Sequence, residues 1–195
     1  CSSDLARTQR VVAVDGGVAL ARTAGLRLDG YVGDGDSLRD GDRRWLEEAR
    51  VPARWHPVEK DQTDLELALA AELDARPDGI EVLGAWGLRA DHTLSNLFLL
   101  ERAARAGVPA GLWAGWERLS VLRPGRHALV PAVAGRRVSL LPLSDAVAGV
   151  RTRGLKYALD GETLTRAAGR GVSNAVAGAQ VEVAFCAGTR AVVQA

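Results

Sequence analysis

The sequence has few cysteines, no long apolar run and a formal net charge of only +1. Its two cysteines and three histidines form neither a CxxC pair nor a Cys/His cluster, so we expect no structural zinc site. No apolar run approaches the roughly 20 residues that a membrane span needs. The small net charge excludes a global field that would attract nucleic acid or an acidic membrane. We therefore expect a protein of the reducing cytoplasm, with neither nucleic acid nor membrane as a partner.

Methionine is absent and lysine is scarce. Because the chain starts at Cys1 and contains no methionine, we expect a short N-terminal piece to precede it. Only two of its 25 basic residues are lysines, Lys60 and Lys156. A lysine ammonium is a compact charge that a guanidinium does not replace, so Lys60 is a candidate functional cation. The alternative is that the two lysines occur by chance in a sequence that is rich in arginine.

Several motifs that would identify a function are also missing. The sequence contains no GxxxxGK[ST] P-loop, no GxGxxG before a helix and no GxSxG nucleophile elbow. A calcium loop starting at Asp34 would need an oxygen ligand at its fifth position and glycine at its sixth. Leu38 and Arg39 stand there instead, so an EF-hand is excluded.

Strand-like and helix-like segments alternate through the first 115 or so residues, which predicts a doubly wound, mostly parallel sheet with helices on both faces. Thr63 and Glu66 form a T-x-x-E capping box at the start of the strongest helix. Strands are expected at 10–14, 31–32, 53–58, 80–85 and 110–115, and helices at 18–25, 43–50, 63–76 and 94–107.

The remaining residues form short strand-like segments separated by turn residues, typical of a small antiparallel β-sandwich or barrel. We therefore predict two domains, an α/β domain over residues 1–117 and an all-β domain over 118–195. The expected strands of the second domain cover 118–123, 127–131, 136–143, 146–154, 155–159, 181–185 and 189–194.

Aspartates follow four of the predicted strands. Because the carboxyl ends of parallel strands meet at one edge of a sheet, we expect these side chains to lie together there. A hard divalent cation bound through oxygen would neutralise such a cluster, and Mg²⁺ suits a few carboxylates plus phosphate oxygens. The residues concerned are Asp15, Asp34, Asp36, Asp61, Asp64 and Asp91.

Each acid has a structural alternative when taken singly. Asp15 could be a turn residue, Asp64 could complement a helix N-terminus, and Asp91 could be an N-cap. The D-x-D spacing also leaves open a phosphatase with Asp34 as nucleophile. Arg89 is a candidate phosphate clamp, with an exposed loop arginine as the alternative.

Ordered motifs across the whole chain resemble those of the thiamine pyrophosphokinase family. VDGG (14–17) is similar to A-D-G-G, and GDGDS (33–37) to G-D-F-D-S. EKDQTDLELAL (59–69) and LGAWGLRADHTLSNLFLL (83–100) resemble two further motifs, and SLLPLSD, GLKYAL and GVSN resemble parts of the thiamine-binding domain. The departures from the family pattern are Gly35, Glu59, Leu88 and Ala90.

The resemblance implies that the thiamine hydroxyl attacks the β-phosphorus of ATP, giving thiamine diphosphate and AMP. The residues 1–117 would then bind ATP and Mg²⁺, and 118–195 would bind thiamine. Asp34, Asp36 and Asp64 would hold Mg²⁺, and Asp91, Asp64, Lys60 and Arg89 would form the catalytic set, with Asp91 orienting or deprotonating the hydroxyl. Nucleotide contacts would come from Asp15, Gly16, Gly17, Ser37, Lys60, Asp61, Thr63 and Arg89.

The same resemblance implies a homodimer whose active sites lie at the subunit interface. Tyr157 would stack on a thiamine ring, and Ser173 and Asn174 would hydrogen-bond the aminopyrimidine, together with Asp91 at the hydroxyl. A half-buried strand aromatic is the alternative for Tyr157. Two other functions remain open: a pyrophosphokinase acting on another alcohol, such as a hydroxymethylpterin, and a nucleotide- or thiamine-binding regulator without turnover.

Overall fold

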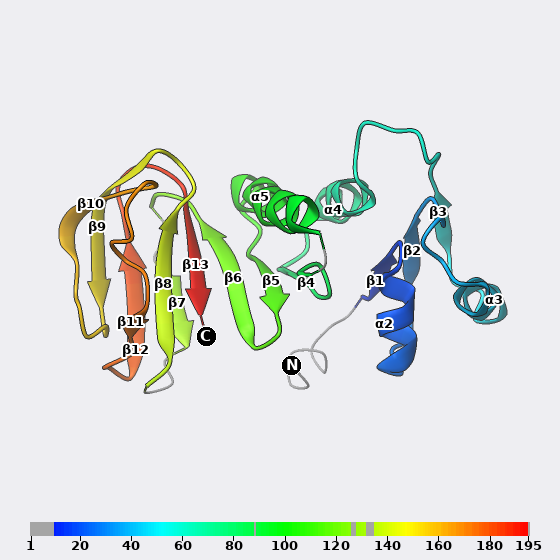
Figure 1. The fold of residues 1–195 in the computed structure, drawn as a ribbon, viewed down its shortest axis with the longest axis horizontal. Helices are drawn as coiled ribbons and strands as arrows, with labels where there is room; N and C mark the ends of the chain where they lie inside the picture. Colours follow the sequence, from blue (N-terminus) through cyan, green and yellow to red (C-terminus); the bar gives the residue numbers. More distant parts are fainter. Residues whose placement is uncertain (1–9, 88, 126–127, 132–134, 195) are drawn as a thin grey trace. The chain divides into compact units, whose positions relative to one another are not determined.

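The computed structural model describes residues 10–87, 89–125, 128–131 and 135–194 (Figure 1). The chain forms two compact units, one ending at Arg76 and the other starting at Pro77. A parallel sheet lies in the first unit, and mainly antiparallel sheets lie in the second. This mixed α/β organisation confirms the predicted fold class. Cys1 and Leu88 lie outside the described residues.

Over residues 10–76, the first unit is a three-stranded parallel sheet with three helices. The strands lie in the order β1-β2-β3, and the chain enters a helix after each of them. Since the strands are parallel, all three strand-to-helix loops leave from the same edge of the sheet. The elements are β1 (Val12–Val14), α2 (Gly17–Thr23), β2 (Gly30–Gly33), α3 (Asp40–Glu48), β3 (Ala53–Trp55) and α4 (Asp64–Asp74).

Helices α2 and α3 cover the side chains of Ala13 and Tyr31 on the sheet. Val18 of α2 and Leu46 of α3 are buried in the same apolar cluster. Helix α4 packs against β1 and β2. Figure 1 shows α3 and α4 on different sides of the three strands, in keeping with the predicted two-sided cover.

The second unit begins with β4 (Ile80–Val82), α5 (Ala90–Ala106) and β5 (Ala110–Ala114). Strand β5 pairs in parallel with β4 and antiparallel with β6 (Glu117–Leu122). Through this hairpin the β4–β5 pair joins a six-stranded sheet, in the order β11-β8-β13-β6-β5-β4. Packing therefore divides the chain after Arg76, whereas the predicted functional boundary after residue 117 falls within the β5–β6 hairpin.

The six-stranded sheet packs on a four-stranded antiparallel sheet, in the order β10-β9-β12-β7, to form a β-sandwich. Alternate residues of both sheets meet in its core, among them Val138 and Leu140 from one sheet and Val181 and Val183 from the other. The remaining strands are β7 (Ala128–Pro131), β8 (Arg137–Pro142), β9 (Ala146–Arg153), β10 (Asp160–Thr165), β11 (Asn174–Ala175), β12 (Gln180–Ala184) and β13 (Arg190–Gln194).

The strand predicted over residues 155–159 is wrong. Leu155 makes only an isolated bridge to Val176, and the next strand begins at Asp160. Leu155 and Leu159 are both buried in the sandwich core, but Tyr157, which a strand would place on the same face, is exposed because the segment loops out. In the other elements the predicted bounds shift by a few residues; α5, for example, begins at Ala90. Among the described helices, none has the length and apolar character that crossing a lipid bilayer would require.

Candidate active site

Asp15 occupies a tight turn between β1 and α2. Its φ angle of 46° lies in the left-handed region, which aspartate tolerates better than most residues. Its backbone N–H donates to Val32 O at 2.9 Å, which fixes the turn to the end of β2. A Cβ atom on the next residue, Gly16, would lie 3.2 Å from Ser37 Oγ. The loops that follow β1 and β2 therefore pack against each other.

Three carboxylates come together where these two loops meet. One carboxylate oxygen from each of Asp15, Asp34 and Asp36 lies within 4.8 Å of the other two. The negative charge of Asp34, followed by burial and then Asp15, raises the pKa of Asp36. The fold therefore disfavours the ionised form of Asp36, and a cation bound between these carboxylates would relieve that repulsion.

Lys60 is the ammonium that contacts this cluster. Its Nζ donates to Asp34 Oδ2 at 2.6 Å and to Pro57 O at 3.1 Å, and lies 3.3 Å from Asp64 Oδ1. Its side chain is only 13% exposed. The hydrogen bond from Lys60 lowers the pKa of Asp34, and the same bond raises the pKa of Lys60. Lys60 thus links Asp64 to the cluster. Its single positive charge is too small to neutralise the carboxylates of Asp15, Asp34, Asp36 and Asp64.

The oxygen atoms of the cluster fit a hard divalent cation. Asp15 Oδ1 is buried and has no hydrogen-bond partner within the part of the chain that the structure describes, and Asp64 Oδ1 has only the Lys60 ammonium nearby, at 3.3 Å. Buried carboxylate oxygens without a donor are costly, and Mg²⁺ prefers such ligands. The closest set contains Asp15 beside Asp34 and Asp36, whereas the sequence predicted Asp34, Asp36 and Asp64 as metal ligands.

The other two aspartates of the stretch from Tyr31 to Asp42 belong to a helix. Asp40 and Asp42 lie in the first turn of α3, where negative charge is favourable. Asp42 is buried and accepts from Arg22 Nη1 at 2.9 Å, which links α3 to α2. These two acids therefore stabilise the scaffold beneath the cluster.

Thr63 is the N-cap of α4, as the capping box predicts. Its Oγ1 accepts from the backbone N–H of Glu66 at 3.2 Å, and Asp64 is the first residue of the helix. The cap therefore fixes the backbone that carries Asp64. Four further predicted nucleotide contacts, namely Gly16, Gly17, Ser37 and Asp61, are exposed on the same three loops.

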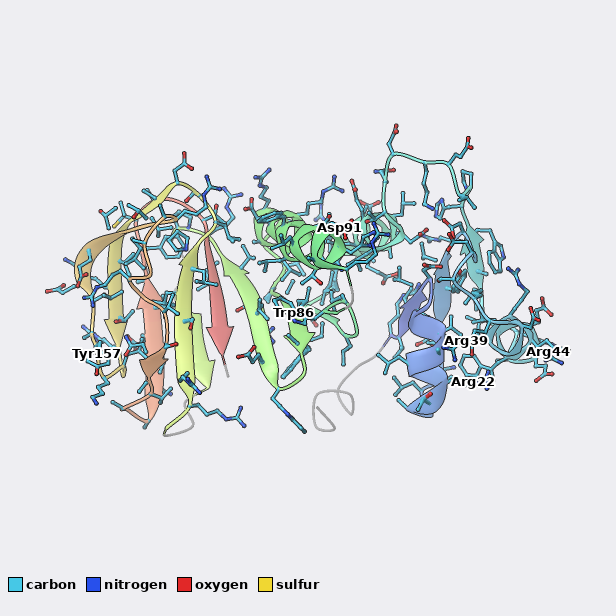
Figure 2. All side chains as sticks on the ribbon, in the orientation of Figure 1. Arg22, Arg39, Arg44, Trp86, Asp91 and Tyr157 are labelled. Atoms are coloured by element: carbon cyan, nitrogen blue, oxygen red, sulfur yellow. The ribbon has the colours of Figure 1, made fainter. Side chains whose placement is uncertain are left out.

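Asp91 lies at the start of α5 in the second unit, as Figure 2 shows, and it pairs with Arg89. Asp91 Oδ1 accepts from Arg89 Nε at 3.2 Å, and Oδ2 accepts from Arg89 Nη2 at 2.7 Å. This guanidinium, followed by the backbone N–H of His92, lowers the pKa of Asp91 to about 2. The alternative of Asp91 as the N-cap is wrong, because Arg89 is the N-cap and Asp91 lies in the first turn.

Apart from Asp91, the predicted thiamine contacts lie on two neighbouring segments of the sandwich, one with Tyr157 and one with Ser173 and Asn174. The Tyr157 side chain is exposed, as Figure 2 shows, and Lys156 Nζ lies 5.4 Å from its ring centroid. The buried Asn174 amide accepts from the backbone N–H of Tyr157 at 3.0 Å and donates to its carbonyl at 2.7 Å. Asn174 therefore holds the backbone of Tyr157. Ser173 adopts a φ of 56° and its side chain is exposed.

The sequence interpretation missed an aromatic pair beside the acid cluster. The rings of Tyr31 and Trp55 have centroids 4.8 Å apart, and the guanidinium of Arg43 lies 5.2 Å from the Trp55 centroid. A Cβ atom on Gly35 would lie 2.8 Å from Trp55 Cζ3. Gly35, between Asp34 and Asp36, was the feature of the sequence that could have indicated this pair, because a glycine leaves room for a large aromatic ring beside it.

Three further tryptophans differ in how far they are buried. Trp45 is partly buried and packs against the core of the first unit. Trp113 is also partly buried, and its indole N–H donates to Glu81 Oε2 at 2.8 Å. Trp86 is 48% exposed.

The sequence is similar to known proteins along most of its length. The family described as "Thiamin pyrophosphokinase, catalytic domain" matches residues 2–111, and "Thiamin pyrophosphokinase, vitamin B1 binding domain" matches residues 126–189. A thiamine pyrophosphokinase of Bacillus subtilis is 31% identical over 163 residues, which cover 84% of this chain and 76% of the relative.

Solved structures of proteins named thiamine or thiamin pyrophosphokinase also resemble the structure of this chain. The thiamine pyrophosphokinase of Bacillus subtilis has a TM-score of 0.87 at 28% identity, covering 94% of this chain and 86% of the other. The enzyme of Geobacillus thermodenitrificans has a TM-score of 0.87 at 29% identity, covering 100% and 91%. The enzyme of Candida albicans has a TM-score of 0.83 at 15% identity, covering 96% and 81%, which shows a shared fold alone.

Proposed function

This chain belongs to the thiamine pyrophosphokinase family, and we propose that it transfers the pyrophosphoryl group of ATP to the hydroxyl of thiamine. The products are thiamine diphosphate and AMP. One observation carries the proposal most directly: the carboxylates of Asp15, Asp34 and Asp36 lie within 4.8 Å of one another at the edge of a parallel sheet, beside Lys60. A protein that only bound a nucleotide would have no need for so many mutually repelling acids.

The reaction requires positioning and charge neutralisation more than covalent catalysis. The thiamine hydroxyl oxygen bonds to the β-phosphorus as the bond from that phosphorus to the α,β-bridging oxygen breaks, so AMP leaves with that oxygen and the hydroxyl proton passes to water. We assign Mg²⁺ to Asp15, Asp34 and Asp36, with Asp64 as a further acid held through Lys60. When bound, the ion neutralises negative charge on the triphosphate.

Lys60 keeps the cluster in place and faces the phosphates. Its contacts with Asp34 and Asp64 span two loops, so it fixes the distance between the second and third strand-to-helix junctions. Gly16 and Gly17 have no side chains, which allows phosphate oxygens to approach the backbone closely. Ser37, Asp61 and Thr63 complete the proposed nucleotide contacts.

Asp91 is suited to orient the thiamine hydroxyl. A carboxylate with a pKa of about 2 is ionised at neutral pH and accepts a hydrogen bond, but it is a weak proton acceptor. Its partner Arg89 carries donors that also suit phosphate oxygens. In this proposal Asp91 fixes the direction of the hydroxyl, and Arg89 screens charge on the transferred group.

Thiamine recognition is assigned to the sandwich. The exposed ring of Tyr157 offers a face for the cationic thiazolium, and Asn174 fixes the backbone that carries it. Ser173 supplies a hydroxyl beside this loop. We also propose a homodimer whose active sites lie at the subunit interface, in the reducing cytoplasm that the low cysteine content favours.

Incubation with Mg²⁺, ATP and thiamine tests the function. We expect AMP and thiamine diphosphate in equal amounts, whereas ADP would mean attack at the γ-phosphorus. A parallel reaction with a hydroxymethylpterin distinguishes the second alcohol, which would be the substrate if it reacted faster. Binding of ATP and thiamine without AMP release would identify a regulator instead.

A further inference from the structure

Tyr31 occupies the central strand of the first unit, directly beneath the acid cluster. Its side chain is only 1% exposed, and its ring lies in the apolar cluster under α2 and α3. Residues two apart in a strand face the same side, so Tyr31 and Gly33 share a face. A Cβ atom on Gly33 would lie 2.4 Å from the Tyr31 hydroxyl and 3.1 Å from Asp15 Cα. The phenol tip therefore ends where the backbone of Gly33 meets the backbone of Asp15.

The hydroxyl of Tyr31 has no hydrogen-bond partner among residues 10–87, 89–125, 128–131 and 135–194. A buried polar group without a partner reduces stability, and phenylalanine would fill the same space without that cost. Packing therefore accounts for an aromatic ring at this position, but it does not account for the hydroxyl group on that ring. Asp15, whose Cα borders the same space, carries a second buried oxygen without a partner among the described residues, Oδ1, an acceptor that matches the phenol as a donor.

We propose that Tyr31 is a positioning residue for the acid cluster, whose hydroxyl donates a hydrogen bond to the Asp15 carboxylate when the cluster holds magnesium. This inference rests on the magnesium site of the proposed function. The bond fixes the direction in which Asp15 presents its other oxygen. Hydrogen-bond partners behind metal ligands act in this way, and their loss lowers metal affinity by roughly 10- to 100-fold.

The substitution Tyr31→Phe separates this role from simple packing. In metal-free protein we expect Tyr31→Phe to melt at the same temperature as the unsubstituted chain or higher, because it removes an unpartnered group. In a MgCl₂ titration followed by thermal unfolding, we expect the half-saturating concentration to rise by about tenfold or more. At saturating Mg²⁺ the turnover should return close to that of the unsubstituted chain.

Thr23→Val is the matched control. It removes a hydroxyl from the same unit, but this one already donates to Ala19 O at 2.8 Å. We expect its Mg²⁺ titration to be unchanged. An unchanged titration in Tyr31→Phe, or a clear loss of stability of that variant without metal, would overturn the inference. If the unsubstituted chain showed no Mg²⁺-dependent stabilisation, the magnesium site would fail, and the inference with it.

Discussion

Asp34 and Asp36 are separated by one glycine, yet their pKa values shift in opposite directions. The Lys60 hydrogen bond lowers the pKa of Asp34, while the charge of Asp34 raises that of Asp36. A folded-state pKa above the unfolded value means that ionisation of Asp36 opposes folding. The destabilisation caused by Asp36 therefore sets in as the pH rises through the ordinary aspartate pKa of 3.8, and it disappears when the pH falls below that value.

We therefore expect Asp36→Asn to raise the melting temperature of metal-free protein at neutral pH while it removes activity. The amide cannot repel Asp34, but it is a poor magnesium ligand, and loss of such charge stabilisation typically costs roughly a hundredfold or more in turnover. Thermal unfolding and AMP release measure the two effects. Asp78→Asn, at an exposed residue outside the cluster, should change neither. A lower melting temperature for Asp36→Asn would contradict the repulsion.

The pair of Arg89 and Asp91 predicts a second pH effect. Because the pKa of Asp91 is about 2 in the folded chain, below its ordinary value of 3.8, the pair stabilises the fold above that ordinary value. This contribution is lost as the pH falls through about 2. In Arg89→Gln we expect the titration midpoint of Asp91, measured by carboxyl NMR, to move up toward 3.8.

Arg105→Gln provides the control for that titration. Arg105 pairs with Glu101 on the last turns of the same helix, at 3.0 Å, so its removal should leave the Asp91 midpoint near 2. High salt should also raise the midpoint in the unsubstituted chain, since both side chains of the pair are about two-thirds exposed. If Arg89→Gln left the titration midpoint of Asp91 unchanged, Arg89 would not be the cause of the low pKa of Asp91.

At the scale of elements, the loop between β2 and α3 depends on a glycine. Gly35 has a φ angle of 80°, which an L side chain adopts at a cost, and Trp55 occupies the space beside its Cα. Arg43 also donates to the Gly35 carbonyl at 3.4 Å. Two independent effects therefore exclude a side chain at this position: backbone strain and contact with the indole.

Alanine at two glycines separates these effects. Gly35→Ala should reduce the free energy of unfolding by about 1–3 kcal/mol from strain, plus a contribution from the contact with Trp55. Gly25→Ala is the matched control, because Gly25 has a φ of 65° and nothing within 4 Å of its Cβ position. Chemical denaturation measures both losses. In a Trp55→Ala background the loss at Gly35 should fall toward that at Gly25, and equal losses in both backgrounds would argue against the contact.

At the scale of the whole molecule, the sheet pairing and the chemistry divide the chain differently. Packing places β4, α5 and β5 with the sandwich, because β5 pairs with β6. The catalytic-domain match nevertheless ends at residue 111, and the thiamine-binding match starts at residue 126. The boundary between the two packing units, after Arg76, therefore differs from the boundary between the two family domains, which lies between residues 111 and 126.

The proposed dimer predicts complementation between inactive subunits. When Asp36→Asn and Tyr157→Ala chains are co-expressed, random pairing should leave about one quarter of the sites with neither substitution, if one subunit completes the site of the other. Activity at low thiamine concentration should recover to that fraction. Co-expression of Asp36→Asn with Asp34→Asn should recover nothing, because every site then keeps one lesion. Activity no higher than the mean of the two single variants would rule out shared sites.

The amino-acid sequence alone determined the order of elements and the positions of the acids. Alternating segments indicated parallel strands, and parallel strands bring the residues that follow them to one edge, so Asp15, Asp34, Asp36, Asp61, Asp64 and Asp91 were predicted together. The structure brings Asp15, Asp34 and Asp36 together, whereas Asp91 follows a strand of the second unit. The Thr63 cap was also readable, because it depends on residues three apart. Local spacing carries this information, since strand and helix periods decide which residues share a face.

Only the tertiary structure decided the contacts around that edge. Lys60 reaches Asp34 across 26 residues, Trp55 fills the space left by Gly35, and the Tyr31 hydroxyl ends beneath Gly33. The pairing of β5 with β6, which carries β4 into the second sheet, is likewise a tertiary choice. The physical reason is that periodicity assigns a residue to a face, but the packing of distant segments selects which side chains meet.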